Sequence, residues 1–433
     1  MSASIAPPRE KVFWHETVEL PSAAPSTPIP SSVDVGIIGG GFTGLSAART
    51  FARHGAKVVV LEAESIGWGA SSRNGGMVLT GLKLGMQTVA KRYGEARARL
   101  LYQCSLDAID TVEQLVTEEK IDCGFRRDGH LVLANKPAHY DGMAREADFL
   151  ARACNHTVEL VAASGLHDEI DSNVYHGALR DGFSAGLNPA QFVAGIARAA
   201  ERAGATLHPY SRVMDISRAA GGFVLETVRG TLRAERILAA TAGYTGQALQ
   251  GLQRRLVPIG SYIIATEPLG PELSASLIPH RRMLFDSMHF LNYFRMWEDR
   301  LVFGGRAAFY PENEKTIQRS AEILRQQMVR VFPQLARVRI EFVWGGTLDF
   351  AFDMMTHVGE MDGILYSLGY AGHGVAMGTY LGKTLAEAAL AGQVHEHPFA
   401  SLPLPPAPLG LYDGRPWFLP LAGLYFRVLD WLE

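Results

Sequence analysis

The chain has 433 residues, of which 47% are hydrophobic and 20% charged, and its formal net charge is -3. This length allows two domains and a large core, and the scattered basic residues give no reason to expect a nucleic-acid partner. Cys104, Cys123 and Cys154 lack the spacing of a zinc site or a disulfide framework, so we expect no metal and a reducing compartment. No secretion signal is evident at the N-terminus, and no apolar run reaches the roughly 20 residues of a membrane span, so we expect a cytoplasmic protein.

The first regular elements form a strand–helix–strand unit. Residues 21–32 are rich in proline, serine and alanine, which indicates an extended linker. Residues 33–38 have the pattern of a buried strand, a glycine turn follows, and residues 43–54 have a helical pattern that Gly55 ends. Because residues 57–61 form a second apolar run, we expect two parallel strands joined by a right-handed helical crossover.

The elements that follow alternate between helical and strand-rich stretches. We expect helices over residues 88–120, 137–153, 189–203, 315–332 and 379–389, and strands at 129–133, within 205–240, within 256–309, at 339–344 and at 363–368. A sheet that begins at residue 33 and ends near residue 390 predicts an α/β fold (α+β overall). In this fold a discontinuous Rossmann-type domain holds an inserted substrate domain built on an antiparallel sheet.

The expected domain boundaries follow from this arrangement. We expect an N-terminal extended segment over 1–32, the dinucleotide-binding domain over 33–86, 154–245 and 340–400, the substrate domain over 87–153 and 246–339, and an apolar C-terminal tail over 401–433.

The first glycine turn matches the GxGxxG pattern of dinucleotide-binding proteins. Gly39 permits the tight turn, Gly41 lets the backbone approach a pyrophosphate, and Gly44 lets helix and strand pack closely. The helix N-terminus favours an anion at this position. Glu62 ends the second strand, where its carboxylate can accept hydrogen bonds from ribose hydroxyls. These features predict a bound dinucleotide, NAD or FAD, with contacts that also include Phe42, Thr43 and Ala63.

The segment after Glu62 favours one of the two cofactors. Residues 65–77 (SIGWGASSRNGGM) are mostly small or glycine, a composition that fills a core poorly but can lie against a flat polar ring system. This segment resembles the flavin-covering segment of the D-amino-acid oxidase-like flavoenzymes, such as glycine oxidase and sarcosine oxidase. The resemblance extends from about Trp14 to Gly392 and is greatest to the branch with gamma-glutamylputrescine oxidoreductase. That branch usually reads GASGRNGG, so Ser72 replaces a glycine here. The resemblance implies FAD, covered by Ser71, Ser72, Arg73, Asn74, Gly75, Gly76 and Met77.

A second glycine-rich turn, residues 369–378 (GYAGHGVAMG), lies between a strand and a helix. In the family, the similar segment runs beside the isoalloxazine ring, and the helix N-terminus can stabilise the negative charge of reduced flavin. We therefore expect the first turn to bind the diphosphate and the second turn to bind the reactive ring of the same FAD. The expected contacts also include Val213, Ala242, Gly243, Gly369, Gly372, His373, Gly374, Val375, Ala376 and Met377.

The cofactor is expected to be noncovalent. Relatives that attach flavin use a cysteine in the late segment or a histidine in the early one, but residues 369–378 contain no cysteine and residues 66–77 no histidine. The chain also has a single ADP-binding fingerprint, whereas a flavin reductase that uses NADPH usually has a second. We therefore expect the organic substrate itself to reduce the flavin, and oxygen (giving hydrogen peroxide) or a quinone to accept the electrons.

The resemblance implies oxidation of a C–N bond. A neutral amine would place its α-C–H over flavin N5, a hydride would leave, and the resulting imine would hydrolyse in water. Binding a substrate carboxylate requires a cation, for which Arg306 is the first candidate and Arg295 the second.

Other polar and aromatic residues are candidates for the pocket. Tyr262, Tyr293 and Trp344 are candidate walls, although aromatic residues in strands more often belong to the core, and His373 is expected to line the site. Asp349 can pair with a second amine of the substrate or cap a turn.

Several alternatives remain open at this point. The substrate is a carboxylate-bearing primary or secondary amine: gamma-glutamylputrescine, an N-substituted glycine such as sarcosine or iminodiacetate, or a D-amino acid. An NAD-dependent dehydrogenase and a non-catalytic or electron-transfer flavin subunit of a larger complex are the rival classes. Residues 416–433 are aromatic and apolar, so this tail docks on the body or a second subunit, or lies on a membrane surface.

Overall fold

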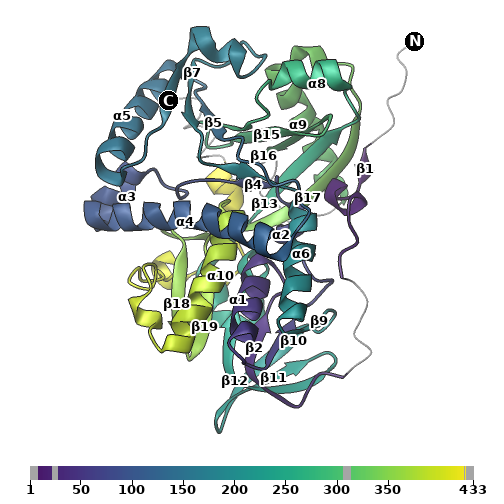
Figure 1. Ribbon diagram of the computed structural model, residues 1–433, viewed down its shortest axis with the longest axis vertical. Helices are drawn as coiled ribbons and strands as arrows, with labels where there is room; N and C mark the ends of the chain where they lie inside the picture. The colour runs from purple at the N-terminus through teal and green to yellow at the C-terminus, as the bar shows by residue number, and fades with distance from the viewer. Residues whose placement is uncertain (1–7, 22–27, 306–313, 424, 426–433) are drawn as a thin grey trace.

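The computed structural model describes residues 8–21, 28–305, 314–423 and 425. The molecule has two parts, each built on a large β-sheet, and helix α4 (Glu95–Glu119) runs between them (Figure 1). The Rossmann-type fold and the second, largely antiparallel sheet confirm the predicted fold class.

The lower part in Figure 1 is the Rossmann-type part. Its sheet has the order β10-β11-β12-β2-β3-β9, with β19 paired to β12 and β18 paired to β19. Strands β2, β3, β9, β12 and β19 pair in parallel, and α1 (Phe42–Arg53), α6 (Pro189–Arg202) and α10 (Gly374–Ala391) lie side by side on this sheet. The strands are β2 (Ser32–Ile38), β3 (Val58–Leu61), β9 (Thr206–His208), β10 (Val213–Ala219), β11 (Gly222–Thr227), β12 (Gly230–Ala239), β18 (His357–Met361) and β19 (Ile364–Leu368).

Small residues allow α1 and α10 to pack closely. A Cβ added at Gly382 would lie 2.3 Å from the carbonyl oxygen of Thr43, so only glycine fits there. Ser46 also donates a hydrogen bond to the carbonyl oxygen of Thr379, at 2.7 Å. Because α1 follows the first glycine turn and α10 follows the second, this packing brings the two turns together.

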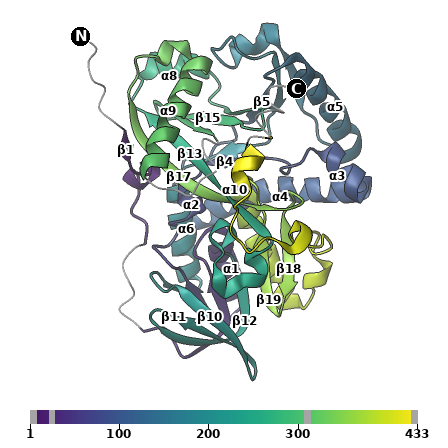
Figure 2. The same cartoon turned by 180° about the vertical axis from the view of Figure 1, so that it is seen from behind.

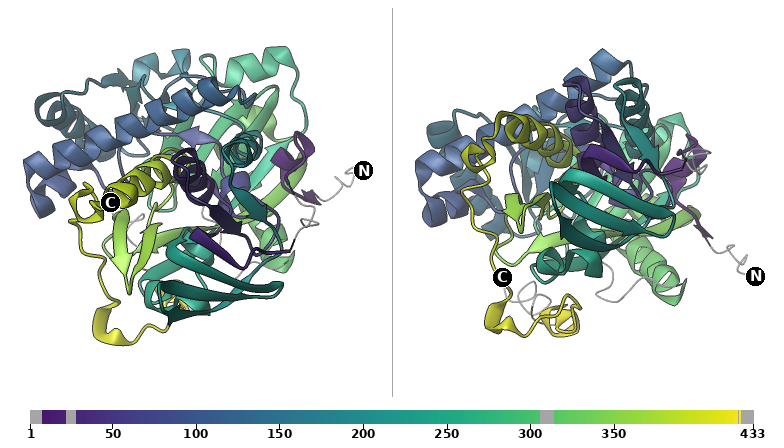
Figure 3. Two further views of the ribbon diagram at one scale, coloured as in Figure 1. Left: turned by 60° about the horizontal axis from the view of Figure 1, so that its bottom comes forward. Right: turned by 90° about the horizontal axis from the view of Figure 1, so that it is seen from below.

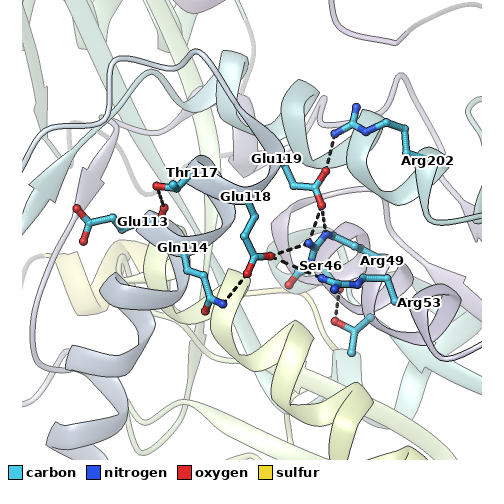
Figure 4. Close-up of polar contacts among 10 residues, drawn as sticks. Ser46, Arg49, Arg53, Glu113, Gln114, Thr117, Glu118, Glu119 and Arg202 are labelled. Atoms are coloured by element: carbon cyan, nitrogen blue, oxygen red, sulfur yellow. Dashed lines mark hydrogen bonds and ion pairs between the residues drawn. The ribbon is translucent and has the colours of Figure 1, made fainter.

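A network of charged residues fixes the opposite end of α1 (Figure 4). Arg49 donates to Glu119 at 2.7 Å and to Glu118 at 3.1 Å, and Arg202 of α6 donates to Glu119 at 2.6 Å. Two carboxylates in the last turn of α4 oppose the helix dipole, and these arginines offset that unfavourable placement. The network therefore holds α1, α4 and α6 in a fixed arrangement.

The upper part contains a nine-stranded sheet with the order β1-β17-β13-β16-β15-β14-β5-β7-β6. Its pairs are antiparallel except β1 with β17 and β14 with β5. Helices α8 (Pro271–Leu277) and α9 (Glu314–Val331) lie over this sheet in the view from behind (Figure 2). The strands are β1 (Arg9–Glu10), β5 (His130–Leu133), β6 (Glu159–Ala162), β7 (Gly177–Asp181), β13 (Leu256–Thr266), β14 (Met283–Asp286), β15 (Asn292–Trp297), β16 (Arg300–Gly305) and β17 (Ile340–Ala351).

Strand pairing differs from the expected domain boundaries at three strands. β6, β7 and β17 belong to the nine-stranded sheet, although the expected boundaries place residues 154–245 and 340–400 in the dinucleotide-binding domain. The reason is pairing: β17 pairs with β13 along the length of β13, and β7 pairs with β5. The helix expected over residues 88–120 is also two helices, α3 (Met86–Tyr93) and α4, because Gly94 adopts a positive φ of 88° between them.

The remaining elements connect and cover these two parts. Helix α2 (Ala70–Arg73) packs on α6 and β17, and α5 (Pro137–Cys154) packs on β7. The short strands β4 (Met77–Val78) and β8 (Ala185–Gly186) pair with each other, and the described segment after α10 runs along the outside of the molecule (Figure 3). Within the described ranges, no helix has both the length and the apolar character needed to cross a membrane.

Candidate active site

The first glycine turn is a tight connection between β2 and α1. Gly39 adopts a φ of 110° and donates its N–H to the carbonyl oxygen of Leu61 at 2.9 Å. A Cβ added at Gly44 would lie 1.9 Å from the carbonyl oxygen of Gly39, so a side chain there would force the turn open. Gly41 is the N-cap of α1, and the first amides of the helix therefore face the space above the sheet edge.

Glu62 lies beside this turn at the end of β3. Its carboxylate accepts the N–H of Gly40 at 2.7 Å and the N–H of Glu64 at 3.0 Å. Burial raises the pKa of this carboxyl, and the backbone donors oppose that effect. The neighbouring strand β10 begins at Val213, close to where the N–H of Ser211 bonds the carbonyl oxygen of Glu62. These contacts hold the Glu62 carboxylate beside the first glycine turn.

The segment at residues 70–77 joins the first turn to the upper part. Ser71 accepts the N–H of Phe42 through its hydroxyl oxygen at 2.9 Å. The side chain of Asn74 donates to the carbonyl oxygens of Ala70 and Ser71 and accepts the N–H of Gly76 at 2.7 Å. Asn74 therefore maintains the shape of the segment with its own side chain.

Aromatic residues support the same segment from behind. The indole of Trp344 donates to the carbonyl oxygen of Arg73 at 2.8 Å, and that of Trp14 donates to the carbonyl oxygen of Asn74 at 2.9 Å. Ser72 is fully buried and is hydrogen-bonded to His15 at 2.8 Å, a contact that a glycine could not make. Trp344 thus lies behind the segment rather than against a ligand.

The second turn is tied to both sheets. Gly369 adopts a φ of 81° and donates its N–H to the buried carboxylate of Asp349 at 2.5 Å. Burial raises the pKa of Asp349 to about 6, and the same hydrogen bond opposes that effect. Asp349 is therefore placed as a turn cap, one of the two roles considered for it.

A direct hydrogen-bonded link connects the two turns. The hydroxyl of Tyr370, in the second turn, is 2.7 Å from the hydroxyl of Thr43, in the first, and 2.8 Å from that of Ser367. The side-chain hydroxyl of Tyr370 therefore links two turns that are 327 positions apart in the sequence.

The segment at residues 70–77 and the second glycine turn line one cavity of about 310 Å³. Gly75 and Met77 line it from the early segment, and Gly372 and His373 line it from the late turn. Strands of the nine-stranded sheet, with Leu291 just before β15, form a further wall: Gly260, Ser261, Leu291, Tyr293, Gly346, Thr347, Leu348 and Phe350. Ala242 and Gly243 follow the C-terminal end of β12 and lie close to β17, because a Cβ added at Gly243 would lie 2.9 Å from the carbonyl oxygen of Thr347.

Two of the lining residues are uncharged and polar near neutral pH. Tyr293 shares a hydrogen bond of 2.9 Å with Ser261, and burial raises its pKa to about 12. Burial lowers the pKa of His373 to about 3, with smaller contributions from Lys83 and His130, so its imidazole is neutral. The Nδ1 atom of His373 is buried without a hydrogen-bond partner among the described residues, so it can bond a ligand group.

Other candidates lie elsewhere. Tyr262 is buried in the core of the upper part, and Arg306 lies outside the described residues. Arg295 donates to the carbonyl oxygens of Gly76 and Leu187, behind the cavity wall.

The cavity also has a polar end that sequence reasoning missed. Thr80, Tyr102, His130, Glu146 and Asp181 line it, and Asp181 accepts hydrogen bonds from Thr80 and His156 at 2.7 and 2.9 Å. These residues come from separate elements with no shared motif, so no sequence pattern identifies them as one group.

A Rossmann turn, a second glycine turn and a cavity walled by an antiparallel sheet define a dinucleotide-dependent oxidoreductase. The chain matches the family model described as "FAD dependent oxidoreductase" over residues 34–388. It is 31% identical over 400 residues to gamma-glutamylputrescine oxidoreductase from Escherichia coli, covering 92% of each chain. It is 33% identical over 430 residues to the probable oxidoreductase OrdL from Rhizobium meliloti, covering 96% of each chain.

A solved structure agrees at the level of the fold. The glycine oxidase of Geobacillus kaustophilus superposes with a TM-score of 0.69 at 21% identity, covering 85% of this chain and 95% of that one. The chain therefore belongs to the FAD dependent oxidoreductase family, as the resemblance noted above implies.

The residues present fit FAD. At one end the carboxylate of Glu62 and the hydroxyl of Ser71 bond to the amides of Gly40 and Phe42, which places both polar groups at the N-terminus of α1. At the cavity end a Cβ added at Gly372 would meet no protein atom within 4 Å. An extended ligand with a diphosphate and a flat ring matches these two ends.

Proposed function

We propose that this enzyme oxidises a carboxylate-bearing primary or secondary amine at its C–N bond, giving an imine that hydrolyses. The observation that carries the proposal is the cavity lined jointly by the segment at residues 70–77 and the second glycine turn, because a substrate bound there would lie against the proposed ring end of the cofactor site. The names of the relatives, among them an oxidoreductase of gamma-glutamylputrescine and a glycine oxidase, support an amine or amino-acid substrate.

In this proposal the chain's residues bind FAD noncovalently at its two ends. Gly39, Gly41, Gly44, Glu62 and Ser71 would hold the ADP half, and the amides of residues 75–77 and 372–377 would face the ring. When bound, FAD supplies the hydride acceptor. The N-terminus of α10 supports negative charge at the ring, since its first amides lack partners within the helix.

The cavity residues would orient a neutral amine and limit water. Tyr293, fixed by Ser261, and the neutral imidazole of His373 offer hydrogen bonds without adding charge. Leu291, Leu348 and Phe350 form apolar walls that exclude solvent from the reacting carbon. Arg306 is proposed to bind the substrate carboxylate.

The test uses the FAD-loaded enzyme without oxygen. Gamma-glutamylputrescine, sarcosine, iminodiacetate and D-amino acids are added singly, and the loss of the oxidised-flavin absorbance is followed. We expect bleaching by at least one of them, followed by peroxide formation in air or by reduction of a quinone analogue. A flavin-loaded protein that none of these amines bleaches would favour a non-catalytic or electron-transfer flavin subunit.

We further propose a cytoplasmic location and a docking role for the tail. Leu419 packs against Val257, Phe350 and Ala371, so the tail is attached to the body beside the cavity. Trp417, Leu421 and Tyr425 are 63%, 67% and 60% exposed, so the described part of the tail presents several large apolar side chains at its surface. A second subunit or an anionic membrane surface would cover them, and gel filtration with vesicle sedimentation distinguishes these two cases.

A further inference from the structure

A second cavity, separate from the one described above, contains a group of arginines. It measures about 240 Å³ and lies between β14, β15, β8 and the segment that precedes β5. We call it the arginine pocket, defined by Arg126, Asp128, Arg281, Arg295, Trp297 and Glu298. Three guanidinium groups and two carboxylates line it.

Arg295 is the most buried charge in the arginine pocket. Its side chain is 5% exposed, and no carboxylate among the described residues lies within ion-pair distance of it. It donates through Nη1 to the carbonyl oxygens of Gly76 (2.6 Å) and Leu187 (3.2 Å), and its guanidinium lies 5.1 and 6.0 Å from the rings of Trp297 and Trp14. Burial lowers the pKa of this guanidinium to about 10, which still leaves it charged at neutral pH. Buried charges in proteins are normally paired, and the carboxylate of Asp128 acts on Arg295 only from beyond ion-pair distance, so Arg295 can accept a negative group from a ligand.

A buried donor and a second arginine lack acceptors in the same pocket. The indole N–H of Trp297 is buried without a partner in the described part of the chain, although buried indoles usually find one. Arg281 donates to the backbone oxygen of Glu298 at 2.7 Å and forms no ion pair with a described residue. Asp128 is already paired with Arg126 at 3.1 Å. The pocket therefore has an excess of donors and of positive charge.

We propose that the arginine pocket binds a small oxyanion, the carboxylate or phosphate group of a free metabolite. Such a group offers several acceptor oxygens and the missing negative charge, and arginine binds both kinds of group through paired hydrogen bonds. The bound oxyanion contacts Arg295, Arg281 and the indole N–H of Trp297. Because Arg295 also holds the carbonyl oxygen of Gly76, the site is connected to the segment that lines the first cavity.

The experiment measures binding directly and needs no turnover. Isothermal titration of the FAD-loaded full-length enzyme, in a chloride-free buffer of low ionic strength, uses inorganic phosphate in one arm and acetate in the other. Loading with FAD keeps phosphate out of the diphosphate site. We expect saturable binding at one site per chain for at least one anion, and the arm that binds identifies the source as phosphate or carboxylate.

Variants test whether that binding occurs in this pocket. Arg281→Gln and Trp297→Phe each remove a donor without touching Gly76, and each should weaken binding about tenfold. Arg53→Gln, an exposed arginine on α1, is the matched control and should bind as the parent does. Unfolding midpoints and the flavin spectrum show that each variant is folded and loaded. Absence of saturable binding of both anions to the parent, or equal binding by parent, Arg281→Gln and Trp297→Phe, would overturn the proposal.

Discussion

The two glycine turns have similar compositions, but their glycines meet different surroundings. In the first turn, Cβ atoms added at Gly39 and Gly44 would lie 2.5 and 1.9 Å from backbone oxygens of the protein itself. In the second turn, a Cβ added at Gly369 would also lie close to a backbone oxygen, that of Met355 at 2.6 Å, but one at Gly372 would meet no protein atom within 4 Å, and one at Gly374 only ordinary contacts. The first turn therefore needs glycine for its own packing, whereas Gly372 needs it for backbone conformation and leaves space beside the cavity. Turns that are both rich in glycine can thus need this residue for different physical reasons.

The largest effect is expected at the first turn. Gly44→Ala places a methyl group inside the turn, so we expect a loss of about 3 kcal/mol or more in the free energy of unfolding. Urea unfolding of the FAD-loaded enzyme measures it. Gly182→Ala is the control, because a Cβ there would meet nothing within 4 Å. Similar stability of the two variants would contradict a packing role for Gly44.

The cap of the second turn should make stability depend on pH. The pKa of Asp349 is raised in the folded state from 3.8 to about 6, so the folded protein binds this proton more tightly than the unfolded chain. The contribution of Asp349 to stability is therefore present at low pH and is lost as pH rises through about 4 to 6, by about 3 kcal/mol in total.

Asp349→Asn measures this contribution, because it keeps an acceptor oxygen for Gly369 but cannot ionise. Relative to the parent, the variant should gain about 3 kcal/mol between pH 4 and pH 7 in urea unfolding. A difference that stays constant with pH would rule out this titration.

Gly372→Ala tests two requirements at this residue, the positive φ of the backbone and the open space beside the cavity. The φ of 106° at this residue should cost an alanine about 1–2 kcal/mol of stability, and the new methyl group should also weaken FAD binding. Gly392→Ala is a matched control, since Gly392 also has a positive φ and an open Cβ position but lies at the C-terminus of α10, outside the residues that line the cavity. Titration of apo-enzyme with FAD should show weaker binding for Gly372→Ala only.

The smallest effect is expected at the link between the turns. Tyr370→Phe removes the hydrogen bonds to Thr43 and Ser367 but keeps the ring, so we expect a loss of about 1 kcal/mol in stability and a several-fold loss in FAD affinity. Tyr210→Phe, at a tyrosine that is 42% exposed, should change neither quantity. Parent-like FAD affinity in Tyr370→Phe would show that the turns hold their positions without this link.

Local patterns predicted the framework well. Each element of the first strand–helix–strand unit is found within one residue of its expected start and end, because its apolar runs and its glycines act locally. The FAD family and the second turn followed from contiguous motifs. The sheet membership of β7 and β17 could not be predicted in the same way, because strand pairing joins residues far apart in the chain.

The candidate site also contains residues that local motifs indicate and residues that depend on tertiary packing. Tyr293 and His373, both singled out from sequence, line the cavity, whereas the cofactor-binding roles of the glycines and of Glu62 stay predictions. Aromatic composition does not distinguish Tyr293, which lines the cavity, from Tyr262, which is buried in the core. The polar cavity end around Asp181 and the hydrogen bond from Tyr370 to Thr43 depend on which elements pack together, and no sequence motif indicates this packing.

The close packing of α1 on α10 has a consequence for how the nascent chain folds. The bond from Ser46 to Thr379 spans 333 positions, and at about 5–20 residues per second the ribosome makes that stretch in roughly half a minute. During this interval the side of α1 that packs against α10 lacks its final partner, although α6, β2 and β3 can already pack on the rest of the helix. Premature termination before α10 would therefore leave an aggregation-prone, protease-sensitive fragment. Slow translation would increase the dependence of the nascent protein on chaperones.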